Sequence, residues 1–235
     1  MFKTLFQTRP VGMFAALMLT LMAGTGCKTD PSAQRVKDQR EAQAARDSFE
    51  SQREPEINVN TRHAAGRLAE ASNNLPLAVQ QYEEALKIDE KHLPSLYRLG
   101  VVHAKMTSYD NAVEAWKKYI KLTDGSGVGY SNLGYTYELA GRLGDAETTY
   151  KAGIALDPDG EPCRVNYGLM LARLGRASEA TLQLQTVLAP AEVHYNLASV
   201  YEQLGRKEQA KVEYNKSIEL DPELQDARTR LAALE

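Results

Sequence analysis

From residue 59 onward, apolar residues recur at helical spacing in short blocks that glycine or proline interrupts. In the block Tyr130–Ala140 the apolar residues fall three and four positions apart, which is the spacing of one face of a helix. Gly141 then breaks the pattern, because glycine takes the left-handed conformation that ends a helix at little cost. A second block, Leu143–Leu156, has the same spacing and ends before Pro158. The pattern predicts two consecutive helices that form a helical hairpin.

This hairpin pattern repeats along the chain, mostly at intervals of 34 residues. One position of the repeat is glycine in four copies: Gly66, Gly100, Gly134 and Gly168. Another is alanine: Ala78, Ala112, Ala146 and Ala180. After a step of 30 residues, Ala198 and Ala210 continue the two series. A bulky residue follows each member of the second series by four positions: Tyr82, Trp116, Tyr150, Leu184 and Tyr214. Because glycine inside a helix costs about 1 kcal/mol relative to alanine, we expect these small residues where the two helices of a hairpin cross closely.

The repeated positions resemble the tetratricopeptide repeat (TPR), with its Leu-Gly pair, its later Ala, its aromatic residue and its closing Pro. The resemblance implies an all-α, right-handed superhelical solenoid in which the first helix of each hairpin lines the concave side. It places five units at 59–92, 93–126, 127–160, 161–190 and 191–224. The first unit departs from the pattern at Ala65 and Glu90, and the fourth is four residues short, so we expect a truncated second helix or a tight turn there. Residues 225–235 are predicted to form a capping helix, with Leu231 and Leu234 packing inward.

The first 26 residues have the pattern of a signal peptide. Lys3 and Arg9 precede an uncharged run at 11–23, which is shorter than the roughly 20 residues of a membrane-spanning helix. Small residues then lead to Cys27, and this resembles a bacterial lipoprotein signal, although Gly24 stands where that pattern usually has Leu. The resemblance implies an acylated Cys27; an ordinary secretory signal with an incidental cysteine is the alternative. Lys28, in place of Asp, indicates the periplasmic face of the outer membrane.

Residues 27–58 are predicted to be a charged spacer between the lipid and the repeats. Phe49 is the only aromatic residue between 28 and 58, so the segment cannot bury a core of its own. Ser32 is expected to cap a helix from about Ala33 to Ser51, and Pro55 is expected to lie beyond its end.

The composition excludes several classes of function. A net charge of -3 argues against a nucleic-acid-binding protein, and two cysteines cannot form paired-cysteine zinc sites. The sequence contains no phosphate-binding glycine loop, nucleophile elbow or HExxH motif. We therefore expect no enzyme, no cofactor, no metal and no small-molecule substrate. The histidines are scattered over the first, second and fifth units and are expected to be surface or groove residues: His63, His92, His103 and His194. Cys163 is expected to be a structural or partly exposed thiol, with a redox or intermolecular role as the alternative.

What remains is a binding surface on the exposed side of the first helices. Its candidate partner-binding residues are Tyr97, Arg98, Lys105, Asn132, Tyr135, Glu138, Asn166, Leu169, Arg173, Tyr195 and Asn196, and the same side carries His63 and Arg67. The three asparagines occupy one repeat position and could pair with the backbone of a bound peptide or brace the neighbouring helix. The lysines of the TPR subclass that binds C-terminal carboxylates are not in register here, so that subclass is excluded.

The sequence therefore predicts a lipid-anchored adaptor that binds protein segments in a concave groove. Small TPR lipoproteins of similar layout include the pilotins, which assist the assembly of secretins, so a secretin or pilus component of the type IV pilus is the expected partner. The alternatives are an adaptor for peptidoglycan-modifying enzymes, a redox protein that uses Cys163, and a structural link between membrane and cell wall.

Overall fold

The computed structural model describes residues 31–50 and 57–234, and within these ranges it contains twelve α-helices and no strand. Two units are distinct: the first extends to Glu56 and contains α1 (Pro31–Glu50), and the second begins at Ile57 and contains all the other helices. The predictions for the signal peptide and Cys27 lie outside the described residues. None of the described helices is long and apolar enough to span a bilayer.

The helix of the spacer begins earlier than the sequence predicts. Helix α1 starts at Pro31, so Ser32 lies inside its first turn and is not the residue that caps it. Proline is well suited to the first turn of a helix, because its missing N–H has no partner there and its φ angle is already helical. The side chains described between 35 and 44 are all exposed, as expected for a helix without a core of its own.

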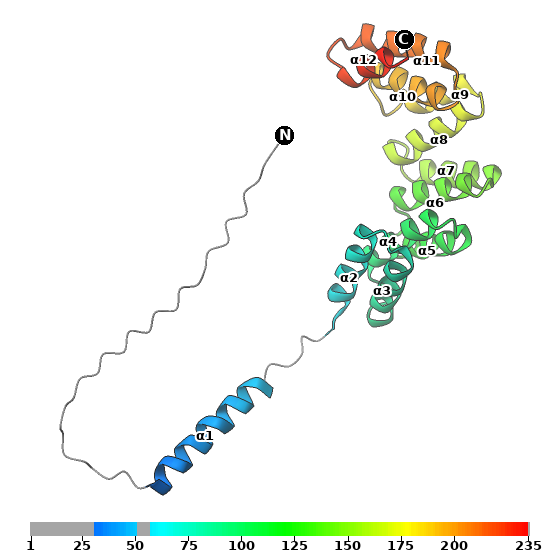
Figure 1. Cartoon of the computed structure of the whole chain (residues 1–235). Coiled ribbons are helices and arrows are strands. Elements are labelled where there is room, and N and C mark those ends of the chain that lie inside the picture. The colour runs from blue at the N-terminus through cyan, green and yellow to red at the C-terminus, as the bar shows by residue number, and fades with distance from the viewer. Residues whose placement is uncertain (1–30, 51–56, 235) are drawn as a thin grey trace, which may run out of the picture. The chain divides into compact units, whose positions relative to one another are not determined.

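In the second unit, the remaining helices follow one another as stacked hairpins (Figure 1). Their bounds are α2 (Val59–Ala71), α3 (Leu75–Ile88), α4 (Leu93–Lys105), α5 (Tyr109–Leu122), α6 (Gly127–Leu139), α7 (Leu143–Leu156), α8 (Glu161–Arg173), α9 (Ala177–Leu184), α10 (Pro190–Gln203), α11 (Lys207–Leu220) and α12 (Gln225–Ala232). The even-numbered helices from α2 to α10 are the first helices of their hairpins, and the odd-numbered helices are the second.

Within each hairpin, the bulky residue of the second helix lies against the small residue of the first. A β-carbon on Gly134 would lie 2.5 Å from Cε1 of Tyr150, and one on Gly100 would lie 2.5 Å from Cε2 of Trp116. Gly66 and Gly168 are covered in the same way by the side chains at 82 and 184. The alanines at the repeat position of the second helices are completely buried: Ala78, Ala112, Ala146, Ala180 and Ala210. The close crossing predicted from the repeat is therefore confirmed, and the glycine of each pair is required by the size of the ring or side chain above it.

The two helices of a hairpin are joined at a residue with a positive φ angle. Glycine occupies this position in the last three hairpins, with φ of 73° at Gly141, 78° at Gly175 and 71° at Gly205. The first two hairpins have Asn73, at φ 56°, and Thr107, at φ 57°, in the same place. The sequence pattern identifies the glycines but not these two residues. A β-branched side chain is strained in this conformation, so Thr107 is the unusual member of the series.

The fourth hairpin and the cap follow the sequence prediction. Helix α9 has 8 residues where the second helices of the other hairpins have 14. A turn that bonds the backbone N–H groups of Val187 and Leu188 to Leu184 leads directly to Pro190 at the start of α10. At the C-terminus, Ala227 of α12 is completely buried, and Leu231 and Leu234 pack against the core.

Candidate functional site

Two pockets open on the side of the first helices and share helix α4. The lining residues of α4 recur at helical spacing, so they form one face of the helix: Leu93, Pro94, Tyr97, Arg98, Val101, Ala104 and Lys105. This is the face that the repeat register assigns to the concave side, and it holds three of the predicted binding residues.

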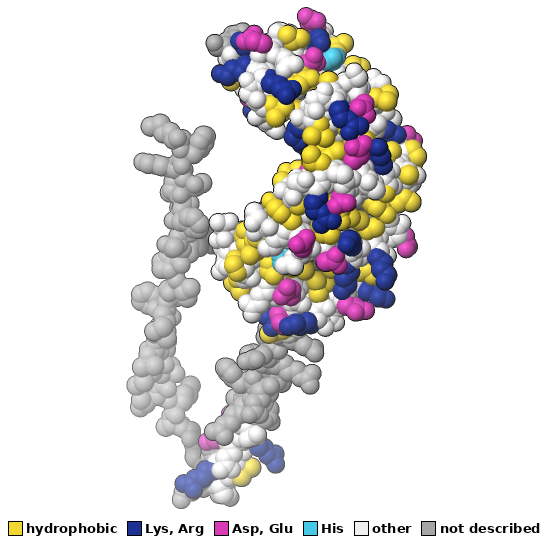
Figure 2. Space-filling model, turned by 90° about the vertical axis from the view of Figure 1, so that its right-hand side faces the viewer, with side chains coloured by type: hydrophobic (Ala, Val, Ile, Leu, Met, Phe, Trp, Pro, Cys, Tyr) yellow, Lys and Arg dark blue, Asp and Glu magenta, His cyan; other side chains and the backbone are white. Residues whose placement is uncertain are grey.

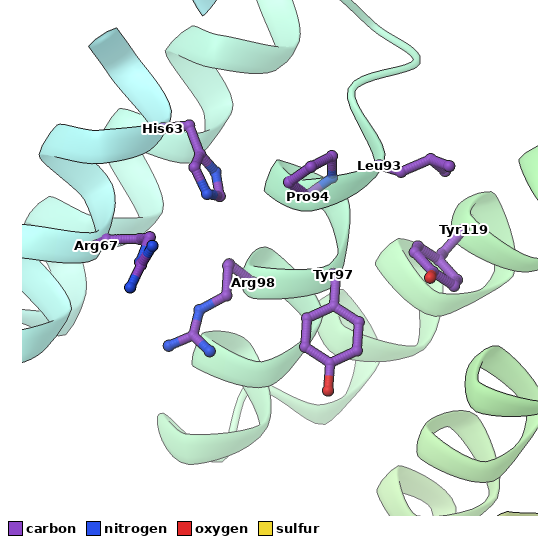
Figure 3. Close-up of a pocket in the computed structure, with 7 residues that line it drawn as sticks. All are labelled: His63, Arg67, Leu93, Pro94, Tyr97, Arg98 and Tyr119. Carbon is purple, nitrogen blue, oxygen red and sulfur yellow. The ribbon is translucent and has the colours of Figure 1, made fainter. Parts of the chain in front are cut away.

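The first pocket, which we call the basic pocket, has a volume of about 390 Å³. Figure 3 shows its lining: His63 and Arg67 extend from α2, Tyr97 and Arg98 from α4, and Tyr119 from α5. Its cationic groups are thus carried by two neighbouring first helices. The pocket can accept an anionic group next to aromatic rings.

The second pocket, which we call the apolar pocket, lies between α4 and α6 and has a volume of about 300 Å³. Its lining is mainly apolar: Val101, Ala104, Trp116, Tyr135 and Leu139, with Lys105, Asn132 and Thr136 at the polar positions. Tyr135 is 45% exposed and Leu139 is 41% exposed. The sequence analysis identified Tyr135 but not Leu139, Trp116 or Thr136, because the last two are buried residues whose edges reach the pocket only through the packing of the hairpins.

Tyr97 is held in place by other aromatic rings. Its ring meets that of Trp116 edge to face at 5.2 Å between centroids, and that of Tyr119 at 6.0 Å. Edge-to-face pairs of this kind are favourable by about 0.5–1.5 kcal/mol beyond the burial of their area. The predicted groove residue Tyr97 is therefore a rigid wall of the basic pocket.

The predicted charged residues Glu138 and Arg173 pair with each other across neighbouring hairpins. Arg173 of α8 donates to Oε2 of Glu138 at 2.7 Å, and the hydroxyl of Tyr150 donates to Oε1 at 2.6 Å. The side chain of Glu138 is only 8% exposed. Burial, together with the charge of Glu138, raises the pKa of Tyr150. We call this arrangement the clasp: a carboxylate joins a tyrosine of its own hairpin to a cation of a later helix.

The same clasp occurs in the first and fifth hairpins. Tyr82 donates to Glu70 at 3.2 Å, and Tyr214 donates to Glu202 at 2.7 Å. The cations come from the helices that follow: Arg98 Nε lies 3.0 Å from Glu70 and Lys105 Nζ lies 2.8 Å from it, while Arg230 lies 3.3 Å from Glu202. Burial by itself would raise the pKa of Glu70, but the hydrogen bonds from Lys105 and Arg98 lower it below its usual value.

The second and fourth hairpins have no clasp, and their sequences show why. The bulky residues there are Trp116 and Leu184, which have no hydroxyl, and the position of the clasp carboxylate holds Ala104 and Ala172. A carboxylate is thus present where a buried tyrosine hydroxyl needs an acceptor and absent where none is needed. Glu70 was missed by the sequence analysis, although its position, 34 residues before Ala104 and 68 before Glu138, could have identified it.

All four charged residues among the predicted binding residues therefore have partners within the chain. Arg98, Lys105, Glu138 and Arg173 are bound to clasp carboxylates or are part of a clasp. Lys105 keeps a side chain that is 52% exposed, whereas Arg98 and Arg173 are about one-third exposed. Their first role is to connect hairpins. They were predicted to be ligand contacts because the sequence does not show which carboxylate each cation pairs with.

The asparagine series braces the first helices. Asn132 donates to the carbonyl of Val128 at 2.9 Å, and Asn196 donates to the carbonyl of Glu192 at 2.8 Å. Asn166 instead donates to the hydroxyl of Ser131 in the preceding hairpin at 2.7 Å. Of the two roles left open by the sequence, Asn166 performs the bracing of a neighbouring helix, whereas Asn132 and Asn196 bond within their own helices.

The remaining predicted residues contribute apolar surface near the C-terminal end. Leu169 and Tyr195 are half-buried and pack against the main core. The ring of Tyr195 lies 5.8 Å from that of Tyr214. They lie outside the two pockets described above, so the structure does not bring all the predicted residues into one site.

The histidines are polar residues of the repeat surface and interior. His63 and His92 both contact the hydroxyl of Ser95, at 3.2 and 2.8 Å. His194 pairs with Glu213 at 2.6 Å. His103 is 8% exposed, and burial lowers its pKa. In the part of the chain that the structure describes, no group of three or more metal-binding side chains is close enough to hold an ion.

Cys163 is a buried thiol, which agrees with the structural role expected from the sequence. It is 2% exposed, and Sγ donates to the carbonyl of Gly127 at 3.3 Å. Burial raises the pKa of the thiol to about 11, which disfavours the thiolate that nucleophilic and redox chemistry needs.

Comparison with protein families identifies tetratricopeptide repeats at three places in the chain. The matched segments are residues 95–122, 129–159 and 191–224, which lie in the second, third and fifth hairpins. They exclude the first and fourth hairpins, in which the sequence departs from the pattern.

Solved structures show the same fold. The chain is similar to TTC0263, a thermophilic TPR protein of Thermus thermophilus, with 26% identity, a TM-score of 0.56, and coverage of 75% of this chain and 98% of that one. A TPR protein from Parabacteroides merdae matches with 14% identity, a TM-score of 0.56, and coverage of 84% and 79%. The MamA protein matches with 18% identity, a TM-score of 0.54, and coverage of 72% and 95%. The prediction of an all-α TPR solenoid is confirmed.

Proposed function

We propose that this protein is a lipid-anchored scaffold, without catalytic activity, that binds a segment of a partner protein on its concave side. The partner is proposed to be a component of an envelope assembly such as a type IV pilus or its secretin. The observation that carries the proposal is the apolar pocket between α4 and α6, where Tyr135 and Leu139 remain exposed beside the edge of Trp116.

The chemistry of this pocket favours a polypeptide over a small polar molecule. Each Å² of apolar surface that a partner covers contributes about 25 cal/mol. Tyrosine, which is exposed here at Tyr135, is one of the residue types that contribute most of the binding energy in protein interfaces. The walls are rigid, since Trp116 is 1% exposed and its ring packs against Tyr97. A rigid pocket loses little conformational entropy when a side chain of the partner enters it.

The lipid anchor is carried by the sequence pattern that ends at Cys27. The charged segment that follows, which includes the exposed helix α1, would keep the repeats away from the membrane surface. The Cys27→Ser variant tests this part separately. We expect it to move from the membrane fraction to the soluble periplasmic fraction, and retention in the membrane would contradict lipidation.

The partner can be tested by affinity purification of the full chain from detergent-solubilised envelopes. The Tyr135→Ala variant should lose the partner, whereas Leu182→Ala should retain it, because Leu182 is 57% exposed on α9 and lies outside both pockets. Recovery of a pilus component or secretin that depends on Tyr135 supports the proposal. Recovery of peptidoglycan-modifying enzymes instead would contradict the pilus assignment and favour the alternative adaptor.

A further inference from the structure

The charges along the concave side are not balanced equally from one end to the other. In the clasps of the third and fifth hairpins one arginine pairs with one carboxylate, Arg173 with Glu138 and Arg230 with Glu202. In the first clasp, both Arg98 and Lys105 pair with Glu70. The clasp nearest the basic pocket therefore carries an excess positive charge that the other two do not.

Arg67 adds to this excess. It is exposed on α2 at the edge of the basic pocket, and it makes no hydrogen bond or ion pair with any of the described residues. Arg67 and Arg98 also act on His63: burial lowers the pKa of this histidine, and the charges of His92, Arg67 and Arg98 lower it further. The basic pocket therefore holds two arginines, of which Arg98 is paired with a carboxylate and Arg67 is not.

The opposite side of the hairpins shows no comparable excess of positive charge (Figure 2). On the side that carries α5, α7 and α9, acidic and basic side chains are intermixed over the surface (Figure 2). The basic pocket is therefore a local feature of the concave side, and it coincides with aromatic walls at Tyr97 and Tyr119.

The distance between the two pockets sets a spacing for a ligand. Their lining residues on α4 are offset by about seven positions, which corresponds to roughly 10 Å along the helix axis. The first pocket also reaches α2 and the second also reaches α6, and neighbouring helices are about 10 Å apart. The direct separation is then roughly 14 Å, which an extended chain covers with about four residues.

We infer that the bound segment carries a carboxylate that lies in the basic pocket beside Arg67 and, about four residues away along an extended chain, a large apolar side chain that fills the apolar pocket. The inference rests on the proposed function, since it specifies the chemistry of the segment that the concave side binds. It also fixes the direction of binding, with the acidic part toward α2 and the apolar part toward α6. The carboxylate is that of an Asp or Glu side chain, because the lysines with which other repeats of this kind hold a C-terminal carboxylate are not in register here.

The test begins with a random peptide library selected on the immobilised full chain, followed by fluorescence anisotropy with synthetic versions of the selected peptides. We expect the selected sequences to combine an acidic residue with an aromatic or large aliphatic residue at the stated spacing. Replacing the acidic residue by its amide should weaken binding about tenfold. Amidation of the C-terminus should leave the affinity unchanged.

Charge reversal on the protein provides the matched comparison. Arg67→Glu should weaken the binding of acidic peptides at least tenfold. Added salt should reduce the difference in affinity between the natural chain and the variant, because screening weakens exposed charge interactions. Lys118→Glu makes the same change of net charge on α5, outside both pockets, and should change affinity less than about twofold. Both residues are exposed, so neither variant is expected to disturb folding.

The remaining outcomes separate this inference from the proposed function. The inference would be overturned if the selected peptides required Tyr135 but lacked acidic residues and bound the Arg67→Glu variant with unchanged affinity. The groove would then still be a peptide-binding site. A library that yields no peptide dependent on Tyr135 would contradict both.

Discussion

The ring of Tyr150 occupies the place where a β-carbon of Gly134 would be, with Cε1 2.5 Å from that position. The ring cannot move aside easily, because it is completely buried and its hydroxyl is bonded to Glu138. We therefore expect Gly134→Ala to destabilise the protein by about 1–3 kcal/mol, even though alanine favours helix by about 1 kcal/mol over glycine. Chemical denaturation followed by circular dichroism measures the change.

Gly144 is the matched control for this prediction. It also lies in a helix, α7, but a β-carbon there would meet nothing within 4 Å. Gly144→Ala should stabilise the protein by about 0.5–1 kcal/mol through helix propensity alone. Equal effects of the two substitutions would contradict the close crossing.

The clasp predicts an energetic coupling between Glu138 and Tyr150. Tyr150→Phe should cost about 1.5–3 kcal/mol, because it removes a hydrogen bond to a charged and nearly buried carboxylate. Glu138→Ala should also destabilise, since it leaves the buried hydroxyl without its acceptor. The double variant should be more stable than the sum of the single effects predicts, by about 1 kcal/mol or more. Strict additivity in this double-mutant cycle would show that the hydroxyl does not depend on Glu138.

Glu147 is expected to account for part of the loss of folding stability at low pH. Hydrogen bonds from Arg176, Lys151 and Tyr167 lower the pKa of Glu147 from 4.5 to about 2. The unfolded chain therefore binds a proton at this site at higher pH than the folded chain, and the stabilisation is complete above about pH 5 and lost as the pH falls toward 2. Because the side chain is 24% exposed, water screens the interaction and the effect should be roughly 1–2 kcal/mol.

The variant Glu147→Gln isolates this contribution. Urea unfolding at pH 6 and at pH 3 should show a smaller loss of stability for the variant than for the natural chain. If the two chains lost the same free energy of unfolding over this range, Glu147 would not be a source of the acid sensitivity.

Thr107 is a site where a substitution should stabilise the protein. A left-handed conformation costs an L-residue about 1–2 kcal/mol, and Thr107 adopts it at φ 57°. Thr107→Gly removes this strain but increases the entropy of the unfolded chain, so the net gain should be about 0.5–1 kcal/mol. The reciprocal variant, Gly141→Thr, places a β-branched residue at φ 73° and should destabilise. A lower thermal midpoint for Thr107→Gly would contradict the assignment of strain.

Local sequence is sufficient to predict most of the fold. The spacing of apolar residues predicts helix Leu143–Leu156 with the bounds that the structure has, and Gly141 predicts the turn before it. The short step of 30 residues predicts the truncated α9. These features depend on residues within a few turns of one another, so their consequences can be read along the chain. Thr107 was missed because its conformation is imposed by the hairpin and contradicts its own preference.

The candidate site depends on contacts between hairpins, which the sequence order does not specify. The sequence identified the side of the first helices and exposed residues such as Tyr135, because repeat register fixes which face a residue occupies. It could not show that Arg98 and Lys105 share the carboxylate of Glu70, 28 and 35 residues away, or that Arg67 is left without one. Those relationships follow from how each hairpin packs on the next, since packing alone decides which charges are brought together and which remain available to a partner.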